Sequence, residues 1–343
     1  MKLKKILALL LALCLVIGMT ACGATETTEA TEATEATDVQ EAAPVDDVTI
    51  RLGALKGPTS MGMSKLLTDS DAGSTVCNYT YQLAGAVDEL TPLFLQGELD
   101  IVAAPSNLGS VLYGKTQGGV QALAVNTLGI LYLVERGEAV TDWESLRGKT
   151  ILASGKGATP EYCLNYLLES NGLTPDVDVT IQYFSEHAEC VAQLAAQEGA
   201  VAMLPQPFVT VAQAKMADLR IAMDLNEEWS NLQNGNGMIT ATLLVRKAFA
   251  EEHPDAVAAF LQEYAASVAF VNENPAEAAQ LIGQLGIVDA AVAEKAIPFC
   301  NIVCITGEEM KQSLAEYLNI LLELAPDSVG GSVPGEDFYF EAP

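Results

Sequence analysis

The feature that most constrains the fold of this chain is a pattern of strands alternating with helices, which occurs twice. Short apolar runs separated by stretches of helical periodicity extend over 48–134, and a second series of the same kind covers 142–223. Strands that alternate with helices form parallel sheets with helices packed on their faces. After a last strand-like run at 238–245 the pattern is helical over 249–324, and 330–343 is an irregular tail. We therefore predict an α/β fold with a helical C-terminal segment.

The two series match in register. A glycine-containing loop occurs early in each of them, Gly57-Pro58-Thr59 in the first and Gly157-Ala158-Thr159 in the second. The loop glycine precedes the proline at the end of a later strand, Pro105 or Pro205, by the same number of residues in both. Two related halves and two ordinary αβ units of similar size both explain this pattern.

The N-terminus is typical of a secretory signal peptide. A basic start, Lys2 to Lys5, precedes an apolar run from Ile6 to Ile17 and small residues that end at Cys22. These small residues resemble a bacterial lipobox, in which the cysteine is lipidated. The apolar run is too short to span a bilayer, which takes about 20 residues, while secretion without a lipid stays open. We predict a lipoprotein signal peptide over 1–22, with Cys22 as the lipidation site.

The segment after Cys22 has the composition of a tether. Residues 25–37 repeat threonine, glutamate and alanine and contain no large apolar side chain. Such a segment cannot bury enough surface to offset the entropy of ordering it. A lone surface helix is the alternative, which the recurring threonine weakens. We predict a disordered acidic tether over 23–47.

The charge and the cysteine count exclude two classes of protein. The formal net charge is −28 at pH 7, which argues against nucleic acid as a partner, because phosphate binding needs basic patches. Seven cysteines include Cys14 and Cys22, and the odd number left in the body argues against a full disulfide framework. Either most of these are small buried apolar residues or Cys300 and Cys304 form a pair.

Compact motifs for catalysis or metal binding are absent from the sequence. The two histidines, His187 and His253, form neither H-E-x-x-H nor a cysteine–histidine cluster. The run at 148–150 lacks the first glycine of a phosphate loop, and the run at 155–157 has Pro160 where a dinucleotide fingerprint needs glycine or alanine. No G-x-S-x-G is present. We predict no catalytic residue, no metal and no cofactor, and hence a protein that is not an enzyme.

Three loops that lead from strands into helices are candidates for ligand binding: 56–60, 105–107 and 156–160. In open α/β sheets ligands lie beyond the carboxyl ends of the strands. Unpaired N–H groups and the helix dipole there favour an anionic or carbonyl oxygen. Simple helix capping explains any one of these loops alone. Loops at equivalent positions of the two series favour a shared cleft.

Three segments of the chain resemble a known family. They are 97–107, with Gly97 to Ile101 followed by Pro105-Ser106-Asn107; 142–160, with Asp142 to Ile151 leading into the second glycine loop; and 238–254. They resemble substrate-binding lipoproteins of ABC importers, in the group of nitrate, sulfonate, taurine and thiamine-pyrimidine binding proteins. The likeness extends over about 48–285.

The resemblance implies a two-lobed clamp of the type II periplasmic-binding-protein fold. Lobe one would be 48–136 plus 238–343 and lobe two 137–237, with strands crossing near 131–135 and 238–244 as the hinge. A solute that touches both lobes would stabilise the closed form. Candidate ligand-binding residues, from the loops, from the lobe junction and from a loop near 229, are Thr59, Ser60, Ser106, Asn107, Asn126, Gly157, Ala158, Thr159, Gln206 and Trp229.

The same resemblance implies a function. The protein would be a monomeric extracytoplasmic lipoprotein, held on the outer face of the bacterial cytoplasmic membrane by the lipid on Cys22. It would deliver a small organic solute to the permease subunits of an ABC importer. Gln206 stands where the family often has an acidic residue. The missing negative charge argues against a cationic group on the solute, so an anionic or heteroaromatic solute is expected. Alternatives are a ligand-sensing lipoprotein without transport and an enzyme similar to thiamine-pyrimidine synthase, whose cysteine-dense run is missing here.

Overall fold

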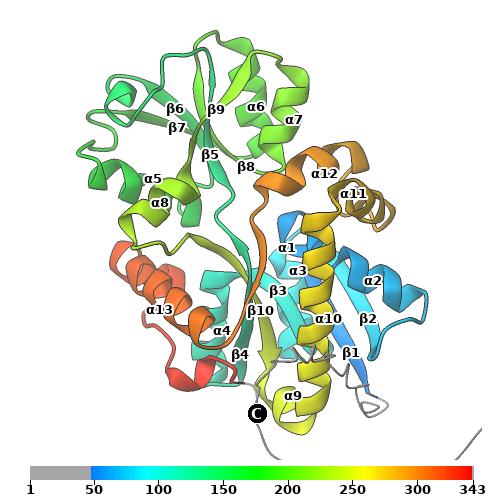
Figure 1. Cartoon of the computed structure of the whole chain (residues 1–343). Helices are drawn as coiled ribbons and strands as arrows, with labels where there is room; N and C mark the ends of the chain where they lie inside the picture. Colours follow the sequence, from blue (N-terminus) through cyan, green and yellow to red (C-terminus); the bar gives the residue numbers. More distant parts are fainter. Residues whose placement is uncertain (1–47, 342–343) are drawn as a thin grey trace, which may run out of the picture. The chain divides into compact units, whose positions relative to one another are not determined.

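The computed structural model describes residues 48–341, which form two β-sheets with helices on their faces (Figure 1). The predicted α/β class is confirmed. The predicted signal peptide, the lipid anchor at Cys22 and the tether over 23–47 lie outside the described residues. Within 48–341 no helix combines the length and the apolar character needed to cross a membrane.

The first sheet carries both parallel and antiparallel strands. They are β1 (Thr49–Leu55), β2 (Asn78–Ala84), β3 (Ile101–Pro105), β4 (Val120–Leu128), β10 (Ile239–Arg246) and β11 (Ile302–Ile305). Their order is β11-β4-β10-β3-β1-β2. β1 is parallel to β2 and β3, whereas β10 runs antiparallel between β3 and β4.

The second sheet repeats this plan with fewer strands. They are β5 (Leu131–Arg136), β6 (Thr150–Ser154), β7 (Thr180–Phe184), β8 (Val201–Pro205) and β9 (Leu219–Asp224). Their order is β7-β6-β8-β5-β9, with β6 parallel to β7 and β8, and β5 antiparallel to β8 and β9. In each sheet, therefore, one strand that the chain enters from the other sheet runs antiparallel between two neighbours: β10 in the first sheet and β5 in the second.

Helices cover both sheets, and the longest lie in the C-terminal part (Figure 1). The helices that follow strands of the first sheet, or lie in the C-terminal part, are α1 (Pro58–Met61), α2 (Ser64–Asp71), α3 (Val87–Leu95), α4 (Ser106–Thr116), α9 (Lys247–Glu252), α10 (Pro254–Glu273), α11 (Pro275–Gln284), α12 (Ala290–Ala296) and α13 (Gly307–Leu324). Those between strands of the second sheet, or after its last strand, are α5 (Thr159–Ser170), α6 (His187–Ala196), α7 (Phe208–Lys215) and α8 (Leu225–Leu232). Short 3-10 turns are η1 (Glu144–Leu146), η2 (Ile297–Phe299), η3 (Pro326–Val329) and η4 (Glu336–Phe338).

One apolar cluster is shared by the two sheets. It contains Val102 and Leu244 of the first sheet together with Leu133 and Ile151 of the second. Burial of apolar surface contributes about 25 cal/mol per Å², so this shared cluster stabilises the contact between the sheets as well as each sheet. Further clusters fill the space under α10 and under α6 and α7.

A buried carboxylate ties three strands of the first sheet together. Asp100, 1% exposed, accepts hydrogen bonds from Arg51 Nε (2.8 Å) on β1 and Arg246 Nη2 (2.5 Å) at the end of β10. Burial raises the pKa of Asp100, but the hydrogen bonds from the two arginines outweigh it and hold the pKa below its usual value. The carboxylate is therefore ionised at neutral pH.

Three expectations differ from the structure. β5 pairs with β8 and β9, so the chain changes sheet between Leu128 and Leu131, not at 136. The stretch 249–324 is not all helical, since the β-branched run Ile302–Ile305 adds β11 to the edge of the first sheet. Trp229 lies in helix α8 and not in a loop. The division of the remaining chain into two lobes stays a prediction.

The cysteines of the described residues form no disulfide. Among residues 48–341 every cysteine is free, and four of the five are buried. The buried interpretation is thus confirmed and Cys300 does not pair with Cys304. Helix α8 is not among the predicted helices. Its start is capped by the carboxylate of Asp224, which accepts from the N–H groups of Asn226 (2.9 Å) and Glu227 (3.3 Å).

Candidate functional site

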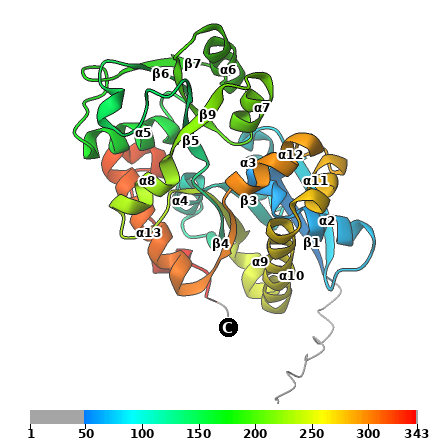
Figure 2. The same cartoon turned by 45° about the horizontal axis from the view of Figure 1, so that its top comes forward.

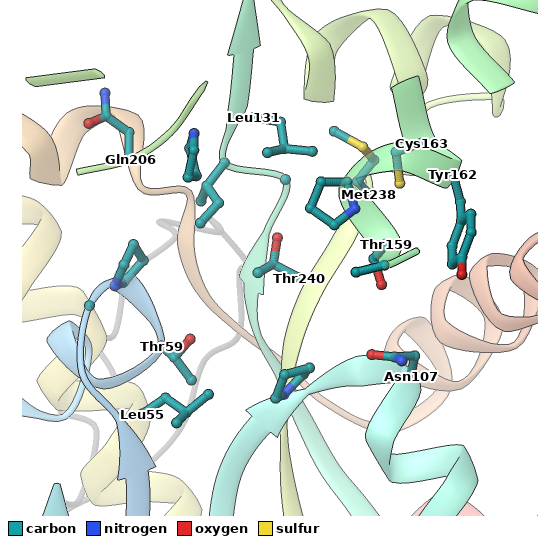
Figure 3. Close-up of a pocket in the computed structure, with 18 of the residues that line it drawn as sticks. Leu55, Thr59, Asn107, Leu131, Thr159, Tyr162, Cys163, Gln206, Met238 and Thr240 are labelled. Atoms are coloured by element: carbon teal, nitrogen blue, oxygen red, sulfur yellow. The ribbon is translucent and has the colours of Figure 1, made fainter. Parts of the chain in front are cut away.

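A cavity of about 660 Å³ lies between the carboxyl ends of strands from both sheets (Figure 3). Its walls come from the loops after β1, β3, β6 and β8 and from the crossing segments next to β5 and β10. The volume falls in the range of about 300–1,000 Å³ that is usual for small-molecule sites. The topology explains the position, because parallel strands bring their carboxyl ends to one edge.

Several helices begin at this cavity. The lining contains the first residues, or the residues just before them, of α4, α5, α6 and α7, with Asn107, Thr159, His187 and Phe208 as examples. The first N–H groups of a helix have no partner within the helix, and the dipole adds positive potential. The cavity therefore offers donors to an oxygen-rich group from elements of both sheets.

The two glycine loops expose backbone to the cavity without an intervening side chain. Gly57 and Gly157 have φ angles of 109° and 75°, a region that favours glycine, and both line the cavity. The equivalence of these loops was predicted from the sequence. The structure places Thr59 and Thr159, one from each loop, in the same cavity (Figure 3).

Hydroxyl and amide groups surround the space in Figure 3. Thr59, Thr159 and Thr240 contribute hydroxyl groups from three different elements. Asn107 donates from Nδ2 to the carbonyl oxygen of Ser328 (3.0 Å), which fixes its amide and leaves Oδ1 as an acceptor. These groups bind polar atoms directionally, while Leu55, Leu131 and Met238 form apolar wall.

Gln206 contributes a buried donor to the lining. The residue is 2% exposed, and its Oε1 accepts from Thr210 Oγ1 (2.9 Å). No described residue pairs with Nε2. A buried donor without a partner costs about 1–3 kcal/mol.

His187 is a lining residue to which no sequence motif pointed. Its Nδ1 forms a hydrogen bond with Ser154 Oγ, and its ring centroid lies 4.8 Å from that of Phe208. Burial lowers the pKa of His187, which the nearby carboxylate of Glu186 partly offsets. The imidazole is therefore neutral at pH 7 and can donate or accept through Nε2.

Six of the candidate residues line the cavity and four do not. Those that line it are Thr59, Asn107, Gly157, Ala158, Thr159 and Gln206. The hydroxyl of Ser60 donates to Gly57 O (3.3 Å) and that of Ser106 to Ile239 O (2.6 Å), so both are used within the fold. Whether the six bind a ligand stays a prediction.

Asn126 and Trp229 are also used within the fold. Asn126 is fully buried in β4, and its Nδ2 donates to Thr59 O (2.9 Å), so it positions the first glycine loop from behind. Trp229 is 1% exposed and packs against Tyr166 and Tyr317. Neither is among the residues that line the cavity.

Two features of the lining bear on covalent and metal chemistry. Cys163 lines it, but burial raises its pKa to about 12, so the sulfur is a neutral thiol. Among the described residues no group of three or more histidine, cysteine or acidic side chains is arranged to hold a metal ion. The lining is suited to binding a solute.

A family model described as the periplasmic substrate-binding protein of phosphonate ABC transporters matches residues 77–296, more than half of the chain. The chain belongs to this family. The predicted resemblance to substrate-binding proteins of ABC importers is confirmed. No curated protein matches the chain. Because the family consists of binding proteins, the enzyme alternative gains no support.

Solved structures of binding proteins share the fold. A chain described as an ABC transporter from Parabacteroides distasonis is 23% identical, with a TM-score of 0.73 over 87% of this chain and 100% of that one. The aliphatic sulphonate binding protein SsuA from Escherichia coli is 14% identical, with a TM-score of 0.67 over 86% and 92%. The nitrate-binding protein NrtA from Synechocystis PCC 6803 is 12% identical, with a TM-score of 0.56 over 84% and 85%. At these identities the likeness establishes the type II periplasmic-binding-protein fold alone.

Part of the lining was not foreseen from the sequence. Tyr162 and Phe208 add aromatic wall, and Tyr317, Asp327 and Ser328 come from the C-terminal part. The last three lie beyond residue 296, where the family match ends. Phe208 follows the strand-ending proline region and was within reach of sequence reasoning. The C-terminal residues gave no local signal, since only tertiary packing brings them to the cavity.

Proposed function

We propose that this protein is an extracytoplasmic lipoprotein that captures a small organic solute and, as a monomer, delivers it to the permease subunits of an ABC importer. The observation that carries the proposal is the cavity, at which helix starts and hydroxyl groups from both sheets converge. A solute in contact with both sheets would favour their closed arrangement. The closed form would then present one surface to the permease.

The lining supports a solute with an anionic or carbonyl oxygen at one end. Helix starts and Lys56 offer positive potential and donors, the neutral His187 offers its Nε2, and Gln206 has an unpaired donor. Asp327 is the acidic residue of the lining. The apolar and aromatic wall would hold an organic portion, aliphatic or heteroaromatic. The structures of sulphonate- and nitrate-binding relatives are in line with such a solute.

A thermal-shift screen tests the proposal. Alkylphosphonates, alkylsulfonates, nitrate and pyrimidines are added to the purified protein, and a true ligand at 100 times its Kd adds about 2.7 kcal/mol of stability. We expect Thr159→Val to weaken the hit about fivefold or more, because a hydrogen bond of about 1 kcal/mol is lost while the shape is kept. Thr180→Val, at an exposed position of β7, is the matched control. Normal binding by the Thr159 variant would place the site elsewhere.

The lipid anchor has a separate test. Replacing Cys22 by serine should abolish incorporation of labelled palmitate in the producing bacterium and move the protein from the membrane to the soluble fraction. Lipidation needs the thiol of Cys22. The substitution lies outside residues 48–341 and does not alter them. A Cys14→Ser variant should keep both label and location. Label that persists in the Cys22 variant would contradict the assignment.

A further inference from the structure

The chain crosses between the two sheets at two glycines. It passes from β4 to β5 through Gly129, and from α8 to β10 through Gly237. A Cβ on Gly129 would lie 2.7 Å from Asn226 Oδ1, and a Cβ on Gly237 would lie at the same distance from that atom. A side chain at either crossing would displace Asn226 from its present position.

Asn226 holds both crossings with one oxygen atom. Its Oδ1 accepts a hydrogen bond from Gly129 N (3.1 Å) and another from Met238 N (2.9 Å). The residue is the second of α8, and its own N–H donates to the capping carboxylate of Asp224. The start of α8 thus connects the two chain segments about which the sheets could rotate.

The middle of α8 connects the second sheet to helix α13. Trp229, buried in α8, lies with its ring centroid 5.5 Å from that of Tyr317 on α13 and 4.9 Å from that of Tyr166 on α5. The hydroxyl of Tyr317 lies 3.7 Å from Cys163 Sγ, also on α5. Because α13 also packs against β4 and α4, it joins elements of both sheets through buried aromatic rings.

The opposite flank has a different character. Figures 1 and 2 show α13 beside α5 and α8 on one flank, and α12 beside α7 on the other. There Tyr132, itself 2% exposed, donates from its hydroxyl to Phe299 O (2.7 Å), while Phe299 is 42% exposed. A hydrogen bond next to solvent can exchange with water. The buried rings of Trp229 and Tyr317 cannot separate without exposing apolar surface.

We propose that α8 is the pivot of the clamp. Opening proceeds about Asn226 and Trp229, α13 stays packed on α5 and α8, and the flank between α7 and α12 separates to admit the solute. This inference rests on the proposed function, since a pivot matters only if a solute enters between the sheets. It assigns to Trp229 a mechanical role in place of the ligand contact expected from the sequence.

Distance measurements on each flank test the pivot. Spin labels on non-natural residues are placed at the exposed positions Lys215 and Lys295 for α7 and α12, and Glu227 and Asn319 for α8 and α13. In full-length protein in detergent, without added solute, we expect a broad distribution for the first pair and a narrow one for the second. A second pair as broad as the first, or broader, overturns the pivot. Two narrow distributions also overturn it, because no opening then occurs.

The hydrogen bonds of Asn226 have their own test. Asn226→Ala removes the shared acceptor, and we expect hydrogen exchange at the amides of Gly129 and Met238 to accelerate at least tenfold. Asn226→Asp keeps an acceptor oxygen in place and should retain most of the protection, which separates the bond from general destabilisation. Unchanged exchange in the alanine variant overturns the proposal. The thermal-shift screen reports solute binding independently, so failure of the pivot and failure of the proposed function are distinguishable.

Discussion

Replacing Asp100 by alanine should lower the free energy of unfolding by about 3 kcal/mol. The carboxylate joins β1, β3 and β10 by accepting from Arg51 and Arg246, and its removal leaves both guanidinium groups without that partner. The two arginines are partly exposed, so water replaces some of the lost interaction and the loss stays at the lower end for a buried ion pair. Urea unfolding of the two proteins measures the difference.

The same carboxylate predicts a pH dependence. The arginine hydrogen bonds lower the pKa of Asp100 in the folded protein, against the opposing effect of burial. A carboxylate with a lowered pKa contributes stability above its unfolded pKa of about 3.9, and the contribution is lost as the pH falls through the folded value. The stability of Asp100→Asn should therefore fall less steeply with acid than that of the wild type.

As a control for Asp100→Ala, Asp218→Ala breaks an exposed pair with Arg136 and should lower the free energy of unfolding by less than about 1 kcal/mol. Equal losses in the two alanine variants would contradict the assignment.

The sequence predicted those parts of the site that depend on local structure. A glycine between a strand and the next helix indicates a loop, and this was enough to place Thr59 and Thr159 in one cavity. The hydroxyl of Ser106 lies in an equivalent loop but donates to Ile239 O, on the crossing strand β10. Residue type and loop position do not distinguish a ligand contact from such an internal bond, because the partner is distant in the chain.

The wrong predictions have two causes, a local helix cap and long-range strand pairing. The prediction that Trp229 is a loop residue leaves out the capping carboxylate of Asp224, and an aromatic residue in a loop is a reasonable ligand contact. Once α8 is a helix, Trp229 lies on its buried face against Tyr317. The limits of β5 depend on long-range packing: its first four residues are apolar, and only pairing with β8 and β9 assigns it to the second sheet.

Replacing Gln206 by glutamate should weaken binding of an anionic solute at least 100-fold. The side chain is buried at the cavity wall, and its Nε2 is the donor that no described residue uses. Glutamate has nearly the same shape but replaces this donor with an acceptor, and two negative charges at close range in a buried site cost several kcal/mol. Titration calorimetry with the ligand found by thermal shift, at pH 7.5, measures the change.

Gln206→Leu separates the loss of the hydrogen bond from charge repulsion. It removes the donor without adding charge, so a loss of about tenfold is expected, much smaller than for glutamate. Both variants keep the volume of the side chain close to that of glutamine, and Thr210 loses its bond to Oε1 only in the leucine variant. An increase in affinity on Gln206→Glu would show that a cationic group lies at this wall, as an acidic residue there would suggest for other members of the family. The sign of this one effect therefore decides the charge of the solute at Gln206.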